Sequence, residues 1–250
     1  MFPLRDENPT LNTAVVTFAI VGLNALVWAL FQGFGTEPAL SRSVCQFGAI
    51  PGELLGTLTQ PVMIPMGTDT VCIVGQTSNW LTPLTSIFLH GNWIHIIGNM
   101  WFLLVFGDNL EDAMGPWRFA AFYLLCGLAA VAAHGLVSPT SPLPMVGASG
   151  AIGGVMGAYA VLYPKVRVQV LLVLGFFITV IKIQALWMLG YWLLIQVVGG
   201  LPAVAGATGV SGVGFWAHIG GFLAGVGLIF PFRDPARLAA QRLARGDEET

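Results

Sequence analysis

Hydrophobic residues gather in long runs along this chain, and short polar or glycine-rich segments separate the runs. Because about 20 apolar residues cross the hydrocarbon core of a bilayer as one helix, the runs predict six membrane-spanning helices. They lie near residues 13–33, 83–107, 117–137, 148–163, 184–200 and 214–232. The predicted fold is an all-α membrane protein with a six-helix bundle over 13–232, preceded by an N-terminal segment, 1–12, and followed by a tail, 233–250.

Two segments between these helices need a separate interpretation. Residues 34–80 form a long first outer loop that is rich in Pro, Gly and Thr but also in Leu and Ile, so we expect it on the membrane surface. The apolar stretch 166–200 is too long for one crossing and barely long enough for two, and its first part is VQVLLVLGFFITVIKI, residues 168–183. We interpret it as an interfacial or partly re-entrant connector.

The basic residues set the predicted orientation of the bundle. With six crossings and both termini in the cytoplasm, nine of the ten Lys and Arg residues lie on the cytoplasmic side, and only Arg42 lies outside. This agrees with the tendency of cytoplasmic segments to carry positive charge. A seventh crossing would instead place the four arginines of the tail outside.

Composition narrows the class of protein. Hydrophobic residues make up 56% of the 250 and charged residues 9%, against roughly 25% charge in a soluble domain, which indicates an integral membrane protein. The net charge of −2 offers no basic surface for nucleic acid. The three cysteines, Cys45, Cys72 and Cys126, show no Cys-x-x-Cys or zinc-finger spacing, so we expect no metal site from them.

Polar side chains within the predicted helices are few, and each is a candidate for function because such groups face the interior of a bundle. His95 and Asn99 lie four residues apart in the second helix, Ser149 lies at the start of the fourth, and His218 lies near the start of the sixth. These helices all enter from the outer face, so their polar groups lie at similar depth. We expect Ser149 and His218 to meet.

Glycine spacing supports that contact. Gly150, Gly153, Gly154 and Gly157 form two overlapping Gly-x-x-x-Gly pairs beside Ser149. Gly221 and Gly225 lie on the helix face of His218. Small residues at this spacing let two helix backbones approach closely.

The absence of acids limits the chemistry. No Asp or Glu occurs from Ala113 through Arg233, which excludes a Ser-His-Asp triad and an aspartyl protease, and no His-Glu-x-x-His motif is present. A hydrolase would therefore use Ser149 and His218 alone. The backbone amides of Ala148 and Ser149, with the side chains of His95 and Asn99, would stabilise the oxyanion.

Each residue also has a simpler interpretation. Ser149 alone is more often a small packing residue, His218 is equally well a hydrogen-bond partner or a proton relay, and Asn99 alone more often joins helices. His90, near the outer interface, either packs or supports the site from behind, and His134 has no evident partner in the sequence. The functional interpretation rests on the coincidence of these signals on helices of one orientation.

Three motifs in order, HxxxN at His95–Asn99, GASG at 147–150 and AHIGGFLAG at 217–225, resemble the rhomboid family of intramembrane serine proteases. FPLRDENP near the N-terminus resembles a bacterial subgroup. The resemblance implies Ser149 as nucleophile, His218 as general base and His95, Asn99 and the Ser149 amide as oxyanion donors. It also implies a water-filled outward cavity, no cofactor, location in the bacterial plasma membrane and single-pass transmembrane proteins as substrates, cut near their outer end.

The chain departs from the family at Gly153, where some relatives carry an aromatic residue beneath the catalytic imidazole. Trp216 and Tyr159 are the candidates to replace it. Cys45 and Cys72 fall in the outer loop, where they form either a disulfide or two free thiols. The alternative function is a catalytically silent rhomboid-like protein that binds membrane clients. A transporter is disfavoured because its core would be expected to hold carboxylates.

Overall fold

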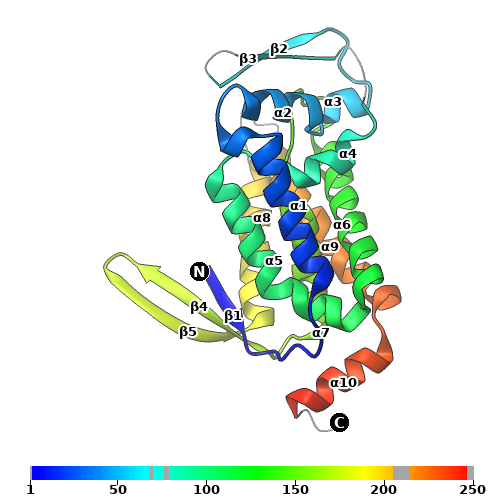
Figure 1. Cartoon of the computed structure of the whole chain (residues 1–250). Coiled ribbons are helices and arrows are strands. Elements are labelled where there is room, and N and C mark those ends of the chain that lie inside the picture. The colour runs from blue at the N-terminus through cyan, green and yellow to red at the C-terminus, as the bar shows by residue number, and fades with distance from the viewer. Residues whose placement is uncertain (1, 68–69, 76–78, 205–213, 247–250) are drawn as a thin grey trace.

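A bundle of long helices forms the body of the protein (Figure 1). The computed structural model describes residues 2–67, 70–75, 79–204 and 214–246, so Met1 of the predicted N-terminal segment and 247–250 of the predicted tail lie outside the described residues. The bundle consists of α1 (Val15–Leu30), α5 (Trp93–Met114), α6 (Pro116–Val137), α7 (Ser149–Leu162), α8 (Ala185–Val204) and α9 (Phe215–Phe232). Each predicted helix overlaps one of these, but the second, predicted near 83–107, begins only at Trp93, where the Asn92 side chain accepts from the His95 amide and caps the helix.

Three of these helices, α6, α8 and α9, are long and apolar enough to cross a membrane. The helices α1 and α7 are apolar but shorter. In α7 the ten consecutive residues Gly150–Tyr159 are all buried. A helix that is apolar and buried on every side lies at the centre of its fold, and α7 contacts α5, α6, α8 and α9.

The predicted outer loop is a folded cap over one end of the bundle (Figure 1). It contains α2 (Ala39–Phe47), α3 (Pro51–Leu54) and the antiparallel strands β2 (Val62–Met66) and β3 (Thr70–Val74). A disulfide joins Cys45 of α2 to Cys72 of β3, and Cys72 is fully buried beside Ile50 and Val74. The short helix α4 (Thr82–Thr85) and a 3₁₀ turn (Ser86–Phe88) lead from the cap into α5.

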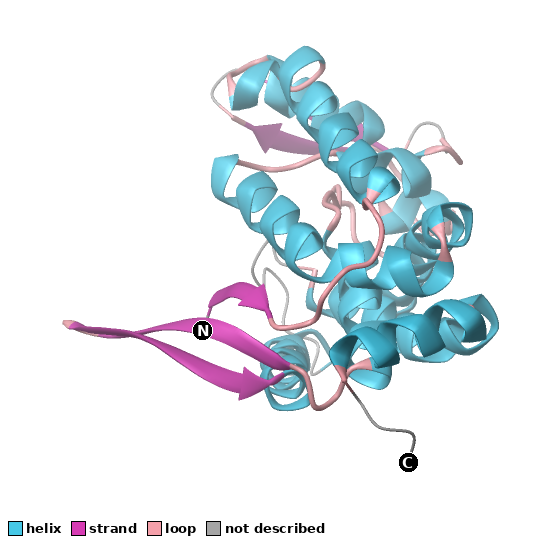
Figure 2. Cartoon of the chain, turned by 60° about the horizontal axis from the view of Figure 1, so that its bottom comes forward, coloured by secondary structure: helices cyan, strands magenta, loops and turns pink. Residues whose placement is uncertain are grey.

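The apolar connector is a β-hairpin, so the prediction of an all-α fold was wrong for this segment, whereas its interfacial position stays a prediction. Strands β4 (Arg167–Leu174) and β5 (Phe177–Gln184) pair antiparallel along their whole length, and β1 (Phe2–Asp6) pairs with β4 (Figure 2). The physical reason is the two-residue alternation and high β-branched content of the segment, with Val168 and Val170 buried while Arg167 is exposed. Gly175, with φ of 60°, suits the tight turn.

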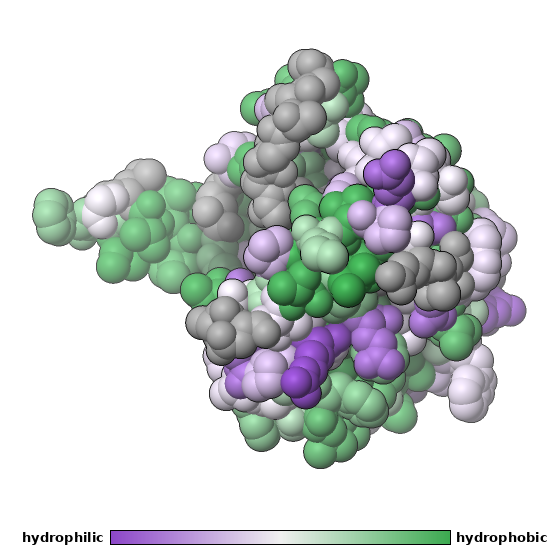
Figure 3. Space-filling view, turned by 90° about the horizontal axis from the view of Figure 1, so that it is seen from above, coloured by the Kyte–Doolittle hydropathy of each residue, from purple (hydrophilic) through white to green (hydrophobic). Residues whose placement is uncertain are grey.

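The hairpin projects sideways from the bundle, and the face of it that Figure 3 shows is mostly apolar. Five side chains toward its tip are at least half exposed: Val173, Phe176, Phe177, Ile178 and Val180. An apolar surface formed by five such neighbouring side chains is not expected to face water.

The acids at the end of the bundle opposite the cap have structural partners. Glu111 of α5 accepts hydrogen bonds from the backbone amides of Val16 and Thr17 in the first turn of α1, where a negative charge is stabilising. Asp112 accepts from the Leu11 amide and the Asn12 side chain. The helix α10 (Pro235–Arg245) packs against this same end of α5.

Asp6, the last residue of β1, ties the sheet to the central helix. Its carboxylate accepts hydrogen bonds from the Tyr159 hydroxyl of α7 and, at 3.0 Å, from Asn109 Nδ2 of α5. Burial raises the pKa of Asp6 from 3.8 to about 7. The neighbouring Glu7 is exposed, and its hydrogen bond to Lys182 lowers its pKa.

We predict that Asp6→Asn makes the protein more heat-stable than wild type near neutral pH. A carboxyl whose folded pKa is raised holds a proton that the unfolded chain has released, so stability falls as pH rises from about 4 to about 7 and stays low above that. The gain in unfolding temperature in detergent micelles should therefore be largest at about pH 8 and shrink toward about pH 4. Glu7→Gln is the control, with the opposite sign near neutral pH, and a pH-independent effect of Asp6→Asn would contradict the prediction.

Candidate active site

Ser149 is the first residue of α7, and the chain reaches it through a glycine turn. Gly147 has φ of 131°, a conformation that favours glycine, and a methyl group on it would lie 2.7 Å from Nε2 of His95. The Gly147 amide donates to the Ser86 carbonyl at 2.9 Å. Only glycine therefore fits where the chain passes between α5 and the start of α7.

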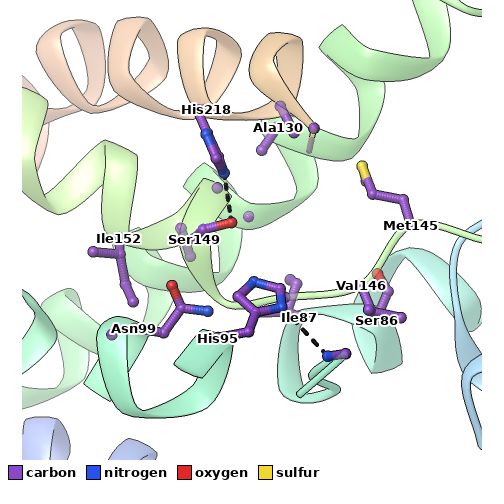
Figure 4. Close-up of a pocket in the computed structure, with 18 of the residues that line it drawn as sticks. Ser86, Ile87, His95, Asn99, Ala130, Met145, Val146, Ser149, Ile152 and His218 are labelled. Carbon is purple, nitrogen blue, oxygen red and sulfur yellow. Dashed lines mark hydrogen bonds between the residues drawn. The ribbon is translucent and has the colours of Figure 1, made fainter. Parts of the chain in front are cut away.

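The structure brings Ser149 and His218 together. His218 Nε2 lies 2.7 Å from Ser149 Oγ, and Figure 4 shows the imidazole of α9 pointing at the serine of α7. This is the distance that a nucleophile and its general base require.

The glycine contacts between α7 and α9 are as close as backbones allow. A methyl group on Gly221 would lie 1.9 Å from the Gly150 carbonyl oxygen, and one on Gly225 would lie 1.9 Å from that of Gly154. A methyl on Gly157 would lie 2.2 Å from the Phe222 carbonyl oxygen. Gly153 is slightly less crowded, with 3.0 Å to the carbonyl oxygen of His218. All six glycines named from the sequence thus lie at or beside this interface.

His95 and Asn99 of α5 lie across a cavity of about 480 Å³ from His218 (Figure 4). The cavity is lined by residues of α5, α6, α7, α8 and α9. His95 Nδ1 accepts a hydrogen bond from the Gly91 amide at 3.3 Å, which leaves Nε2 as the protonated nitrogen that faces the start of α7. Asn99 is buried, and its Nδ2 has no hydrogen-bond partner among the described residues.

These groups have the properties of oxyanion donors. Ala148 directly precedes α7 and Ser149 is its first residue, so the helix has no acceptor of its own for either amide. His95 Nε2 and Asn99 Nδ2 add side-chain donors from α5. Donors fixed in place before the reaction are what a developing negative charge requires.

Two other histidines lie farther from the cavity. The buried ring of His90 packs edge-on against His95, with ring centres 5.1 Å apart, and Gln32 bonds both its backbone amide and its carbonyl. His134 of α6 does not line the cavity. Within the described ranges no group of three His, Cys, Asp or Glu side chains could hold a metal ion.

The sequence interpretation missed two residues of α8. Gln196 Oε1 lies 2.8 Å from Nδ1 of His218, and the Trp192 ring lies 5.8 Å from the His218 ring. The expectation that Trp216 or Tyr159 takes the aromatic position was wrong, because the Trp216 indole donates to the Gly200 carbonyl and the Tyr159 hydroxyl donates to Asp6. The sequence does contain a signal for Gln196, since it is a polar amide in the middle of a predicted helix whose other glutamine, Gln184, lies at its very start.

The fold and the site together define a mostly helical membrane protein with a serine and an imidazole in contact inside its bundle. Residues 77–235, well over half of the chain, match the family model of the Rhomboid domain. The chain belongs to the rhomboid family, which confirms the resemblance of its motifs.

The chain is also similar to individual rhomboid proteins. It is 30% identical to Rhomboid-like protein 11, chloroplastic, of Arabidopsis thaliana over 60% of this chain and 52% of that protein. It is 30% identical to RHOMBOID-like protein 5 of the same plant over 68% of this chain and 49% of that protein. It is 32% identical to Rhomboid protease GluP of Bacillus subtilis over 41% of this chain and 20% of that protein. The chain thus spans about half the length of the two plant proteins and less of the third.

We predict that Gly221→Ala lowers the free energy of unfolding by about 1–3 kcal/mol, because the added methyl would overlap the Gly150 carbonyl and force the helices apart. Equilibrium unfolding in mixed micelles measures this change. Gly227→Ala is the matched control, since it lies on the same helix and a methyl there would meet nothing within 4 Å. Equal effects of the two substitutions would show that the contact does not limit stability.

Proposed function

We propose that this protein is an intramembrane serine endopeptidase that uses Ser149 and His218 as a catalytic dyad. Its substrates are single-pass membrane proteins, which it cuts near the outer ends of their transmembrane helices. The observation that carries the proposal is the 2.7 Å contact between Ser149 Oγ and His218 Nε2. Family membership supports it, and one of the similar proteins is named as a protease.

In the first half of the reaction, Ser149 Oγ forms a bond to the carbonyl carbon of the peptide while His218 Nε2 takes the hydroxyl proton. The negative charge on the former carbonyl oxygen is stabilised by the donors of Ala148, Ser149, His95 and Asn99. The carbon–nitrogen bond then breaks as Nε2 gives its proton to the leaving amine. The product of this half is an ester on Ser149.

In the second half, a water molecule attacks the ester carbon and His218 Nε2 takes its proton. The bond to Ser149 Oγ breaks, and the proton returns to Oγ. A new carboxyl end is released. The net change is hydrolysis of one peptide bond, without a cofactor.

The substrate must be unwound at the cut, because an intact helix holds its carbonyls in hydrogen bonds. The cavity is lined by residues of α5 to α9 and also by Met145, which is bridged to Ala49 of the cap, so it lies in the half of the bundle nearer the cap. We place this half toward the outer face, with six crossings and both chain ends in the cytoplasm. In support, β1 and α10, close to the two ends of the chain, lie at the same end of the bundle (Figure 1).

The membrane in which the protein resides is a separate part of the proposal. Its membrane character follows from the family and from the apolar helices. The bacterial plasma membrane rests only on the likeness of the N-terminal segment. The similar proteins come from a plant, where one is named as chloroplastic, and from a bacterium, so they favour no single membrane.

We predict that Ser149→Ala and His218→Ala each abolish both labelling by a fluorophosphonate probe and cleavage of a model transmembrane substrate in proteoliposomes. The probe requires an activated serine, which neither variant retains. Ser86 also lines the cavity but donates to the Pro83 carbonyl, so Ser86→Ala tests which serine is labelled and should keep the label. Labelling that survives Ser149→Ala would assign the nucleophile elsewhere, and a folded wild type that neither labels nor cuts would favour the silent client-binding protein.

We predict that Asn99→Ala lowers kcat about 10- to 1,000-fold with little change in KM, because it removes one donor that acts mainly in the transition state. Steady-state kinetics in detergent micelles measures both constants. An increase in KM with unchanged kcat would instead assign Asn99 to substrate binding.

A further inference from the structure

The imidazole of His218 is held at both nitrogens. Its Nε2 contacts Ser149, and its Nδ1 lies 2.8 Å from Oε1 of Gln196, a residue of α8 that is only 6% exposed. We infer that Gln196 is a positioning residue that fixes His218 in the tautomer a general base needs. This inference rests on the proposed function and names a third member of its catalytic group.

The orientation of the Gln196 amide follows from its second hydrogen bond. Its Nε2 lies 3.3 Å from the carbonyl oxygen of Trp192, one turn earlier in α8. A carbonyl oxygen only accepts, so the NH₂ group of the amide must point there and the amide oxygen must point at His218. Oε1 then accepts from Nδ1–H, and the lone pair of His218 Nε2 faces the Ser149 hydroxyl.

A neutral amide suits this environment. In a charged triad the acid both fixes the imidazole tautomer and stabilises the imidazolium, and the first role requires only an acceptor. A buried carboxylate among apolar helices would carry a large desolvation cost, which a glutamine avoids. Gln196 thus supplies the orientation of a triad without its charge.

Trp192 and Gln196 are four residues apart, so they lie on one face of α8. The Trp192 ring packs against His218 and, at 6.2 Å between ring centres, against Phe222 of α9. The same helix face therefore limits rotation of the imidazole on one side and bonds its nitrogen on another. The position of α8 controls the general base, although α8 supplies no group that touches the reacting atoms.

Kinetics test the inference with two substitutions, one that removes the acceptor and one that keeps it. Gln196→Met keeps the length but removes the acceptor, and should lower kcat about 10- to 100-fold with KM nearly unchanged, less than the roughly 10⁴-fold of a wrong tautomer in a charged triad. Gln196→Glu keeps an acceptor at this position and should keep activity. It should also move the acidic limb of the pH–rate profile to higher pH, because a carboxylate stabilises the imidazolium of His218. Val198→Met places a methionine on the exposed side of α8 and is the control, because it should leave kcat unchanged.

A spectroscopic readout separates this inference from the proposed function. Nitrogen-15 NMR of the full-length, histidine-labelled protein in micelles should show His218 mainly with the proton on Nδ1, the signal being assigned with His218→Ala. Gln196→Met should shift it toward the Nε2 proton. An unchanged tautomer, or an unchanged kcat, in Gln196→Met overturns the inference, whereas the expected NMR shift in a protein that cuts no substrate overturns the proposed function alone.

A second cavity, of about 1100 Å³, lies at the other end of the bundle and is an independent observation. It is bounded by α10, by the connection from α7 to β4 and by the N-terminal segment. Its cationic lining residues are Lys165, Arg167, Arg233, Arg242 and Arg245. Among the described residues that line it, the one carboxylate is Glu7, which forms an ion pair with Lys182.

The walls of this cavity are fixed in place. The Tyr163 hydroxyl donates to Gln241 of α10, and the Arg245 guanidinium lies over the Tyr163 ring and donates to Asn8 at 3.0 Å. Lys165 and Arg242 are exposed, and neither forms an ion pair within the described ranges. The charges of Lys165 and Arg242 are therefore available to an anion.

We propose that this cavity binds the phosphate of an anionic phospholipid headgroup. Positive charge attracts a phosphate from any source, but Leu243 also lines the cavity and is 73% exposed. An apolar side chain beside arginines suits a headgroup with an attached acyl chain better than a free ion. The apolar hairpin β4–β5 begins at the same wall, with Arg167.

Native mass spectrometry of the full-length protein tests the site by counting phosphatidylglycerol molecules retained against phosphatidylcholine. The double variant Lys165→Gln, Arg242→Gln should lower phosphatidylglycerol retention at least about fivefold. Arg42→Gln, an exposed cation in the cap, should not. Equal retention in the double variant overturns the proposal, and so does displacement of the lipid by inorganic phosphate at equal concentration, which would indicate a free-phosphate site.

Discussion

The contact of α7 and α9 at the level of their backbones is the constraint on which the site depends. The carbonyl oxygens of Gly150 and Gly154 occupy the space that methyl groups on Gly221 and Gly225 would need. Ser149 adjoins one of these glycines and His218 lies one turn before another, so the glycine spacing and the 2.7 Å contact of the reactive pair are parts of one arrangement. A larger side chain at this interface would separate the hydroxyl from the imidazole even though neither was altered.

Charged and neutral side chains serve different ends of the bundle. Glu111 and Asp112 bind the start of α1 and Asp6 binds α7, so these acids hold the elements at the end opposite the cap together. In the half of the bundle around Ser149, neutral groups contact the imidazole of His218, namely the amide of Gln196 and the ring of Trp192. This separation keeps carboxylates out of the region where their desolvation would cost most, and it leaves orientation of the imidazole to hydrogen bonding and packing.

The parts of the site that local spacing determines could be predicted from the sequence. The four-residue interval of His95 and Asn99, the glycine pairs and the matching depth of Ser149 and His218 all follow from helix geometry and from the order of the crossings. Gln196 could not be paired with His218 in this way, because the rotation of α8 about its axis depends on packing against α9. For the same reason Trp192, rather than Trp216 or Tyr159, lies beside the imidazole.

The hairpin escaped prediction because hydropathy summed over a window does not separate a buried helix from two strands whose tip is apolar on both faces. In β5, exposed and partly buried residues alternate from Ile178 to Gln184, but β4 alternates only near the base, where Val168 and Val170 are buried and Arg167 is exposed. Pairing with β1 then decides the outcome, since residues more than 160 positions apart form that ladder. The carboxylate of Asp6, at the end of β1, accepts a hydrogen bond from the Tyr159 hydroxyl, so the sheet is attached to the central helix. This long-range contact favours a strand at β4, and the local sequence of the hairpin does not indicate it.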